Sequence, residues 1–342
     1  MDKARPLISV IVPIFNSAAY LCSCFESILG QSEQNIELIA VDDCSTDNSL
    51  DVCKQFSERD SRVTVVANEK NIGQGLSRNK GIEISSGKFI TFVDSDDTID
   101  SRMYSTLLAA AETCDAQVAR CGFRRVTAHD VSALEMNDDV PTRCLSGLEL
   151  KRYLDGYYGM LPSESLSDAP SASPCTALYD GDIVRQRGIR FPSERLVRSE
   201  DLFFNIEAST CADRLALVDA PLYDYLVRPG STTRTFSSPI GKCELLSKLA
   251  PEGDDYSLRL TRSYLTAIKE ASIQLALSKQ PLAQSVREVS NLEQRLCIKE
   301  RLSSYPVDEL PGRERVFAHA ARLGLTLPEV LMGRIDVVRR VL

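Results

Sequence analysis

The chain has 342 residues, and its 40 lysines and arginines against 48 aspartates and glutamates leave a net charge of −8. This acidic balance excludes a protein that binds nucleic acid through a broadly basic surface. The presence of only two histidines argues against multi-histidine metal sites, and a catalytic triad would have to use one of them. A hydrophobic fraction of 43% with 26% charged residues indicates a globular chain, whose length suggests about two domains.

The eleven cysteines are scattered and form no Cys-x-x-Cys pair, which argues against zinc ribbons and thioredoxin-like sites. We therefore expect reduced thiols and a reducing compartment. The apolar stretch near the start, Leu7 to Phe15, is too short for a signal peptide, and no run is long enough to span a bilayer. These features predict a cytoplasmic protein, and a peripheral contact with the inner face of the membrane stays open.

Strand-like apolar runs alternate with helical spacing over roughly the first hundred residues. Strands are expected at residues 7–15, 36–41, 63–67 and 89–93. Helices are expected at residues 18–29, after Ser45–Thr46, and at 74–85. Because the strands are apolar throughout, they predict an open, doubly wound α/β fold with helices on both faces of a mostly parallel sheet. In such sheets ligands bind beyond the carboxyl ends of the strands.

The rest of the chain is less regular before it becomes helical. Residues 163–174, rich in Ser, Ala and Pro, predict a mobile loop, and a structured block is expected over 175–225. Helical spacing then predicts helices at 256–278, 283–302, 306–323 and 328–342. The last of these combines an apolar face with arginines, so both an interfacial membrane helix and packing onto the catalytic domain stay open.

Polar side chains follow the end of each of the four expected strands, where one edge of a parallel sheet would collect them. The sharpest group is Asp94-Ser95-Asp96-Asp97, whose three carboxylates repel one another unless a cation joins them. Oxygen ligands without histidine favour Mg²⁺ or Mn²⁺ with positions open for a diphosphate. The glycine motifs that cradle phosphates are incomplete, so the sequence predicts phosphates held through a metal ion.

Six segments, in this order and spacing, resemble family 2 glycosyltransferases of the bacterial polysaccharide type, which have the Rossmann-like GT-A fold. They are SVIVPIFN (9–16), LIAVDDCSTDNS (38–49), NIGQGLSRNKGIEISSGKFITFVDSDD (71–97), GIRFP (188–192), SEDLFF (199–204) and YDYLVRPGSTTR (223–234). The resemblance implies a GT-A domain over 1–238, with a nucleotide-sugar half (1–123) and an acceptor half (124–238), and an all-helical region over 239–342.

The activity implied by the resemblance is an inverting, metal-dependent transfer of a sugar from a nucleoside diphosphate sugar, a UDP-sugar. The acceptor would be a hydroxyl of a saccharide or lipid-linked molecule in cell-surface polysaccharide biosynthesis. Asp201 would be the general base, and Asp96 with Asp94 would hold Mn²⁺ or Mg²⁺. The other donor-binding positions would be Pro13, Phe15, Asn16, Asp42, Asp43, Asn71, Gly73, Arg78, Ser95, Arg228 and Arg234. Ala18, Cys44 and Ser77 depart from the family pattern.

Two other functions stay open. Asp94-Ser95-Asp96-Asp97-Thr98 also fits the pattern of haloacid-dehalogenase-like phosphatases, in which the first Asp is a nucleophile, although that motif normally follows the first strand of its domain. A module that binds a nucleotide sugar without catalysis is the second. A purely structural role for Glu200-Asp201 also stays open, because the start of a helix favours negative charge. Tyr223 and Tyr225 alternate as on a strand and are expected to be packing residues.

Overall fold

The structure is a computed structural model, and it describes residues 5–127, 140–227, 236, 238–278, 280–326 and 330. Contacts divide the chain into two units. The first comprises Met1–Lys151 and Ser171–Arg228, and the second comprises Arg152–Pro170 and Pro229–Leu342. The division therefore differs from the expected one at residue 238 chiefly because Arg152–Pro170 belongs with the C-terminal helices. The helix expected over 328–342 lies, apart from residue 330, outside the described residues.

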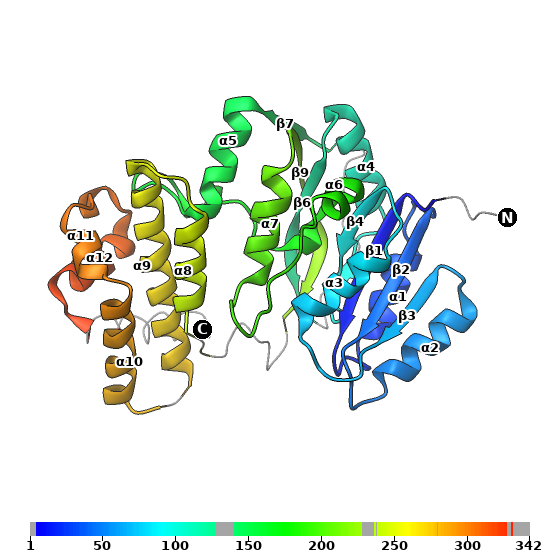
Figure 1. Ribbon diagram of the computed structural model, residues 1–342, viewed down its shortest axis with the longest axis horizontal. Coiled ribbons are helices and arrows are strands. Elements are labelled where there is room, and N and C mark those ends of the chain that lie inside the picture. Colours follow the sequence, from blue (N-terminus) through cyan, green and yellow to red (C-terminus); the bar gives the residue numbers. More distant parts are fainter. Residues whose placement is uncertain are drawn as a thin grey trace. The chain divides into compact units, whose positions relative to one another are not determined.

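A mixed sheet forms the first unit, with nine strands among the described residues (Figure 1). Its first four strands are β1 (Ile8–Ile14), β2 (Ile36–Asp42), β3 (Val63–Ala67) and β4 (Phe89–Phe92). They pair in parallel in the order β3-β2-β1-β4. All of β1 and β4 is buried, as expected of strands covered on both faces. The predicted α/β class and parallel half-sheet are confirmed.

The helices between these strands pack closely on the sheet. They are α1 (Leu21–Leu29), α2 (Ser49–Arg59) and α3 (Gln74–Ile84). In α1, Leu21, Phe25 and Ile28 are buried at helical spacing, which gives the helix one apolar face. In α3, a Cβ added at Gly81 would lie 2.4 Å from Ile11 Cγ2, so glycine permits the close approach of α3 to β1.

The second half of the sheet introduces antiparallel pairing. Its strands are β5 (Thr98–Ile99), β6 (Val118–Val126), β7 (Thr142–Ser146), β8 (Ala177–Asp180) and β9 (Arg214–Leu226). Strand β8 is antiparallel to β4 and β6, whereas β9 is parallel to β6 and antiparallel to β5 and β7. The helices of this half are α4 (Met103–Cys114), α5 (Gly147–Asp155), α6 (Gly181–Gln186) and α7 (Glu200–Thr210).

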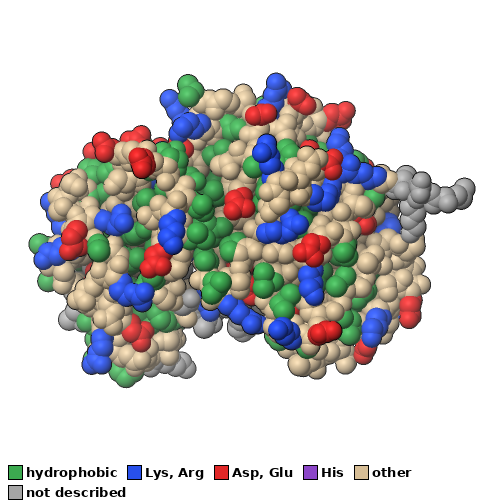
Figure 2. All heavy atoms as spheres, in the orientation of Figure 1, with side chains coloured by type: hydrophobic (Ala, Val, Ile, Leu, Met, Phe, Trp, Pro, Cys, Tyr) green, Lys and Arg blue, Asp and Glu red, His purple; other side chains and the backbone are tan. Residues whose placement is uncertain are grey.

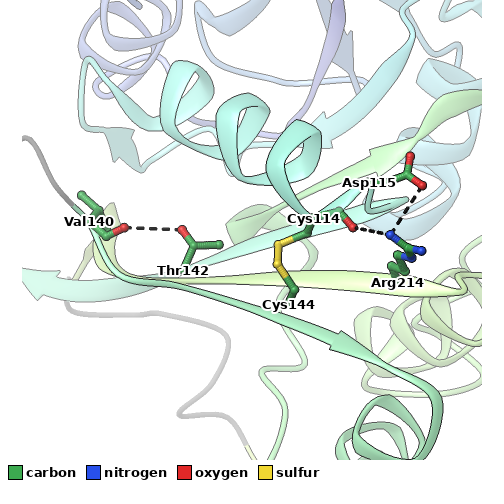
Figure 3. The surroundings of a disulfide bond; sticks show 6 residues. All are labelled: Cys114, Asp115, Val140, Thr142, Cys144 and Arg214. Atoms are coloured by element: carbon green, nitrogen blue, oxygen red, sulfur yellow. Dashed lines mark hydrogen bonds and ion pairs between the residues drawn. A yellow bond between two sulfur atoms is a disulfide. The ribbon is translucent and has the colours of Figure 1, made fainter.

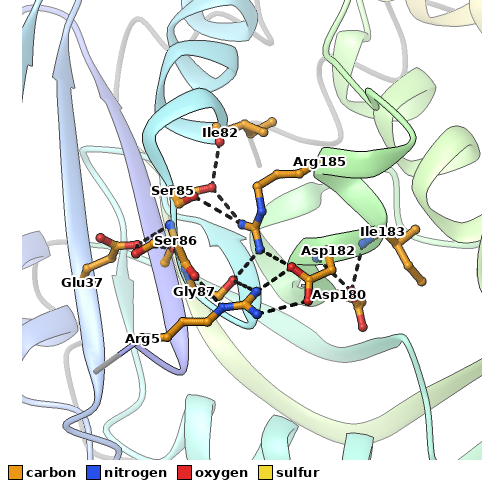
Figure 4. Close-up of polar contacts among 11 residues, drawn as sticks. Arg5, Glu37, Ile82, Ser85, Ser86, Gly87, Asp180, Asp182, Ile183 and Arg185 are labelled. Atoms are coloured by element: carbon orange, nitrogen blue, oxygen red, sulfur yellow. Dashed lines mark hydrogen bonds and ion pairs between the residues drawn. The ribbon is translucent and has the colours of Figure 1, made fainter. Parts of the chain in front are cut away.

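Two arginines fasten the amino end of β4 (Figure 4). Arg5 donates to Asp182 Oδ1 at 2.6 Å and to the Gly87 carbonyl at 3.1 Å, and Arg185 donates to the same two groups at 2.9 and 2.8 Å. A Cβ at Gly87 would lie 2.5 Å from the backbone nitrogen of Ser9, so the chain is closely packed here. Since Asp182 is half exposed, its ion pairs stabilise little, and the carbonyl contacts hold the edge.

The second unit is helical, as predicted. Its helices are α8 (Ile240–Leu249), α9 (Asp254–Leu277), α10 (Leu282–Arg295), α11 (Ile298–Ser303) and α12 (Gly312–Leu323). In α9, the buried Arg262 donates to the carbonyl oxygens of Leu161 and Glu164. In the first unit, the buried Arg120 donates to the carbonyls of Ser171 and Ser173. Buried arginines thus hold the segment that was expected to be a mobile loop.

No helix in the described parts of the chain is both long and apolar enough to cross a bilayer. On the face drawn in Figure 2, acidic and basic side chains are interspersed, and neither sign forms a continuous field. The net charge of −8 is therefore not concentrated in one acidic patch on that face.

A disulfide corrects the expectation that all thiols are reduced (Figure 3). It joins Cys114, the last residue of α4, to Cys144 on β7, with 5.3 Å between the two Cα atoms. The other nine cysteines are free, and five of them are buried. Sequence spacing did not reveal the pair because the two positions are 30 residues apart, and only the fold brings α4 beside β7.

We predict nine reactive thiols in the denatured, unreduced protein and eleven after reduction. Replacing Cys114 by serine should lower the free energy of unfolding by about 2–4 kcal/mol, because the bond restricts the unfolded chain. Urea denaturation without reductant measures this loss. Cys211→Ser, which removes an exposed free thiol, is the matched control and should leave stability unchanged. Equal stabilities of the two variants would contradict a structural role for the bond.

Candidate active site

The loops that follow β1 and β2 are joined by Asn16. Its φ of +52° lies in the left-handed region, which asparagine tolerates. Its Oδ1 accepts hydrogen bonds from the backbone nitrogen of Thr46 at 2.8 Å and from Thr46 Oγ1 at 3.2 Å. Beside it, the ring of Phe15 is 48% exposed, whereas Pro13 is buried within β1. Of these three expected base-pocket residues, Phe15 and Asn16 are exposed, and Phe15 offers an accessible aromatic ring.

The two aspartates at the end of β2 differ in their surroundings. Asp42 Oδ2 accepts from the Ser45 nitrogen at 3.1 Å, and its buried Oδ1 has no hydrogen-bond partner within the described residues. Asp43 accepts from the nitrogens of Ile72 and Gly73, at 2.9 and 2.8 Å, with different oxygens. Asp43 therefore positions the loop before α3, and Asp42 has an acceptor atom to offer to a ligand.

The start of α3 is covered by a segment distant in sequence. Glu194 Oε1 accepts from the Gln74 nitrogen at 3.1 Å, and Arg195 donates to Asn71 Oδ1 at 2.7 Å. Gly73, at φ +98°, leaves the space that the Glu194 carboxylate occupies, since a Cβ there would lie 1.6 Å from Oε1. A carboxylate at a helix N-terminus compensates unpaired backbone N–H groups. Sequence reasoning missed both Glu194 and Arg195.

Arg78 in α3 is the centre of the site and is completely buried. Its Nη1 donates to Asp201 Oδ1 at 2.6 Å and its Nη2 donates to Asp94 Oδ1 at 2.8 Å. Glu200 Oε1 lies 3.6 Å from Nη1, and the guanidinium carbon lies 5.1 Å from the ring centre of Phe191. One positive charge thus joins the end of β4 to the start of α7 and faces three carboxylates.

The carboxylates around Arg78 are not fully compensated. Burial, together with the charges of Glu200 and Asp94, raises the pKa of Asp201 to about 7 against the opposing attraction of Arg78. Burial also raises the pKa of Glu200. An aspartate with a pKa near neutrality is suited to accept a proton at physiological pH. Asp201, the residue expected to be the base, therefore has a pKa that suits a general base.

The turn after β4 contains the predicted metal ligands. Asp94 Oδ1 accepts from both Arg78 and Gln74 Nε2, the latter at 2.8 Å, and Asp96 is half-buried. Ser95 was expected to contact the nucleotide sugar. In the structure its Oγ donates a hydrogen bond to Ser17 Oγ at 2.7 Å. Burial and the charge of Asp94 raise the pKa of Asp97 to about 8.

These residues fit a divalent cation that is shared with a ligand. In the described ranges, no three His, Cys, Asp or Glu side chains are arranged to hold an ion by themselves. The surplus of carboxylates over the Arg78 guanidinium nevertheless favours a cation, and carboxylate oxygens suit Mg²⁺ and Mn²⁺. Mg²⁺ is commonly held by one or two carboxylates together with phosphate oxygens of a ligand. Asp96 and Asp94 would supply the carboxylates.

The structure thus brings most of the predicted residues to the carboxyl edge of the sheet. Arg228 and Arg234 lie outside the described residues. Cys44, which departs from the family pattern, has a φ of +61°, a backbone conformation that favours glycine. Glu194 carried no signal in the sequence, because it lies 120 positions from Gln74 and no local motif relates the two.

This arrangement, a Rossmann-like sheet with carboxylates and a base gathered at one edge, is typical of α/β enzymes that act on nucleotide-linked substrates. The model of glycosyl transferase family 2 matches residues 9–186, just over half of the chain. The chain therefore belongs to glycosyl transferase family 2. This membership sets aside the phosphatase alternative.

Two curated relatives are similar to parts of the chain. It is 47% identical to the glycosyltransferase GlyG of Streptococcus pneumoniae over 112 residues, 33% of this chain and 37% of GlyG. It is 28% identical to the succinoglycan biosynthesis protein ExoO of Rhizobium meliloti over 234 residues, 68% of this chain and 64% of ExoO. The aligned part is thus less than two thirds of either relative.

The structure of Staphylococcus aureus TarS 1–349 in complex with UDP matches with a TM-score of 0.60 and 20% sequence identity. The match covers 98% of this chain and 92% of that one, and TarS 1–349 has also been solved in complex with UDP-GlcNAc. At this identity the likeness establishes the fold alone, which is the GT-A fold with a C-terminal helical region.

Replacing Arg78 by alanine would leave Asp94, Glu200 and Asp201 without their shared counter-charge. We expect the free energy of unfolding at pH 7 to fall by about 3–5 kcal/mol, as measured by urea denaturation. The loss should shrink toward pH 5. Without Arg78, the pKa values of these carboxylates should be raised further in the folded state, so the folded variant binds more protons than the unfolded one. Its folding is therefore favoured as pH falls.

The matched control is Arg143→Ala, which removes an arginine that is 70% exposed and pairs with Glu149 at 2.9 Å. Such surface pairs contribute about 0–1 kcal/mol. Equal losses in the two variants would show that Arg78 is no more important to folding than a surface ion pair.

Proposed function

We propose that the chain is an inverting, divalent-metal-dependent glycosyltransferase. It would move a sugar from a nucleoside diphosphate sugar, a UDP-sugar, to a hydroxyl of a saccharide or lipid-linked acceptor in cell-surface polysaccharide biosynthesis. The observation that carries the proposal is the buried Arg78, which holds donor-side Asp94 and base Asp201 together. Family membership supports sugar transfer, the UDP and UDP-GlcNAc complexes of TarS support the donor, and the name of ExoO supports the polysaccharide role.

Asp201 is the proposed general base. Arg78 engages its Oδ1, which leaves Oδ2 to take the proton from the acceptor hydroxyl. A base of this kind contributes about 10²–10⁴-fold to the rate. The acceptor oxygen would attack the anomeric carbon from the side opposite the leaving nucleotide. A single displacement without a covalent intermediate inverts the anomeric configuration.

The donor would be held at the ends of β1, β2 and β4. The exposed ring of Phe15 is suited to stacking on the base, and the unpaired Oδ1 of Asp42 is suited to accepting its N–H. Asp96, with Asp94, would hold Mn²⁺ or Mg²⁺, which when bound neutralises the charge that develops on the leaving diphosphate. Asn71, Gly73, Arg228 and Arg234 remain proposed donor contacts.

The cellular location proposed here is the cytoplasm, with peripheral membrane contact left open. Nine free thiols agree with a reducing compartment, in which the Cys114–Cys144 bond would be open to reduction. The alternative of a module that binds a nucleotide sugar without catalysis is not favoured, since Asp201 and Arg78 are both in place.

The donor proposal is tested by a thermal-shift experiment with UDP and GDP, each with and without Mn²⁺. A ligand that binds only the folded state at a hundredfold excess over its Kd stabilises by about 2.7 kcal/mol, which raises the melting temperature by several degrees. We expect the largest shift with UDP and Mn²⁺ together. Phe15→Ala should reduce this shift, because stacking of a base on an aromatic ring contributes about 1–3 kcal/mol.

Phe123→Ala is the matched control, since Phe123 on β6 is also 48% exposed. We expect it to keep the full shift with UDP. Absence of any shift with either nucleotide in the wild type would refute the donor proposal. Equal shifts for Phe15→Ala and the wild type would remove Phe15 from the base pocket.

Replacing Asp201 by asparagine should lower kcat by about 10²–10⁴-fold, because the base is lost, while the thermal shift with UDP and Mn²⁺ is kept. In the wild type, kcat should fall about tenfold for each pH unit below the Asp201 pKa of about 7, since the protonated carboxyl cannot act as a base. The residual activity of Asp201→Asn should lack this pH dependence.

Glu207→Gln, which changes another carboxylate of α7, serves as the control and should retain the wild-type rate and pH profile. Full activity of Asp201→Asn, or a wild-type rate that stays level from pH 8 to pH 5, would assign the proton to another group.

A further inference from the structure

The turn that contains Asp96 is tied to β9 by a tyrosine hydroxyl. Tyr223 is 3% exposed, and its Oη accepts a hydrogen bond from the Asp94 nitrogen at 3.2 Å. The same Oη donates to Asp97 Oδ2 at 2.7 Å. The second oxygen of Asp97 accepts from the Leu226 nitrogen at 2.8 Å. Tyr223 therefore contacts both ends of the turn, and Asp97 is engaged through both of its oxygens.

The strand pairing shows why this link is needed. The turn enters from β4, which pairs with β1 and β8, and it leaves into β5, which pairs with β9. Strand β4 does not pair with β9 in the described sheet, so no backbone ladder joins the two sides of the turn. The hydrogen bonds of Tyr223 and Asp97 link the two sides of the turn in place of a backbone ladder. The hydrogen bond from the Asp97 nitrogen to the Asp94 carbonyl, 3.0 Å long, closes the turn itself.

We propose that Tyr223 and Asp97 are positioning residues that fix Asp96 and Asp94 for a divalent cation. The inference rests on the metal dependence in the proposed function. Asp97 is not a ligand in this arrangement, because Tyr223 and Leu226 already engage its two oxygens. Groups that hydrogen-bond behind metal ligands orient them, and their loss typically weakens metal affinity about 10- to 100-fold. Tyr223, expected to be a packing residue, acquires a functional role.

The test measures Mn²⁺ affinity directly, by electron paramagnetic resonance of free Mn²⁺ in the presence of saturating UDP. Tyr223→Phe keeps the ring and removes only the hydroxyl, and we expect the Mn²⁺ Kd to rise about tenfold or more. In the transfer reaction, the Mn²⁺ concentration for half-maximal rate should rise in parallel. The kcat at saturating Mn²⁺ should stay close to that of the wild type. If Tyr223 acted through packing alone, its loss would not change the Mn²⁺ requirement while leaving kcat unchanged.

Tyr104→Phe is the matched control. Tyr104 on α4 is fully buried, and its hydroxyl has no hydrogen-bond partner in the described part of the chain. This variant should keep the wild-type Mn²⁺ affinity.

Asp97→Asn supplies a second variant of nearly the same shape. Its Mn²⁺ affinity should also fall, and the loss in the double variant Tyr223→Phe/Asp97→Asn should be clearly smaller than the sum of the two single losses, because the two residues share one hydrogen bond. Wild-type affinity in both single variants, or losses that add independently, would overturn the inference alone. Absence of Mn²⁺ binding by the wild type would instead overturn the proposed metal dependence, and the inference with it.

Discussion

The site depends on one buried cation surrounded by more negative charge than it can neutralise. Arg78 has no exposed surface, and the three carboxylates of Asp94, Glu200 and Asp201 face its guanidinium. Removing such a charge from water is costly unless several hydrogen bonds and opposite charges replace the solvent. Burial and the same surplus of negative charge that holds Arg78 in place raise the pKa of Asp201, and the surplus favours a divalent cation at the site. Stability and chemistry therefore share one cluster.

The sheet explains how residues from distant segments reach this cluster. Strands β1, β2 and β4 run parallel, so the loops that follow them meet at one edge. Helix α3 presents Arg78 to that edge, and α7 begins with Glu200 and Asp201 there. Strand β9, which is parallel to β6, reaches the same edge at its end, where Tyr223 supports the Asp94–Asp97 turn. Arg78 thus holds both Asp94 and Asp201, and Tyr223 holds Asp97, in each case from an element other than that of the carboxylate.

Much of the fold was predictable because its signals are local. The apolar runs of β1 to β4 and the helical spacing between them follow from burial on both faces of a parallel sheet. The pairing of the later strands was not predictable, since β8 and β9 acquire their neighbours only in the folded chain. The Cys114–Cys144 bond was missed for the same reason. Residues 163–174 looked mobile from composition, yet buried arginines elsewhere in the chain hold the backbone at both ends of the segment.

Residue order alone was sufficient for the α/β class and the helical C-terminal region, and it named the candidate carboxylates, because motif spacing along a strand and its loop is a local property. It could not assign their partners. Asp201 and Arg78 are 123 positions apart, and Glu194 lies 120 positions from Gln74. Asp42, Asp43, Asp96 and Asp97 are alike as sequence letters, and their contacts in the fold distinguish them. Burial and hydrogen bonding are properties of neighbours in space, so only the tertiary structure separates a candidate ligand from the residue that positions it.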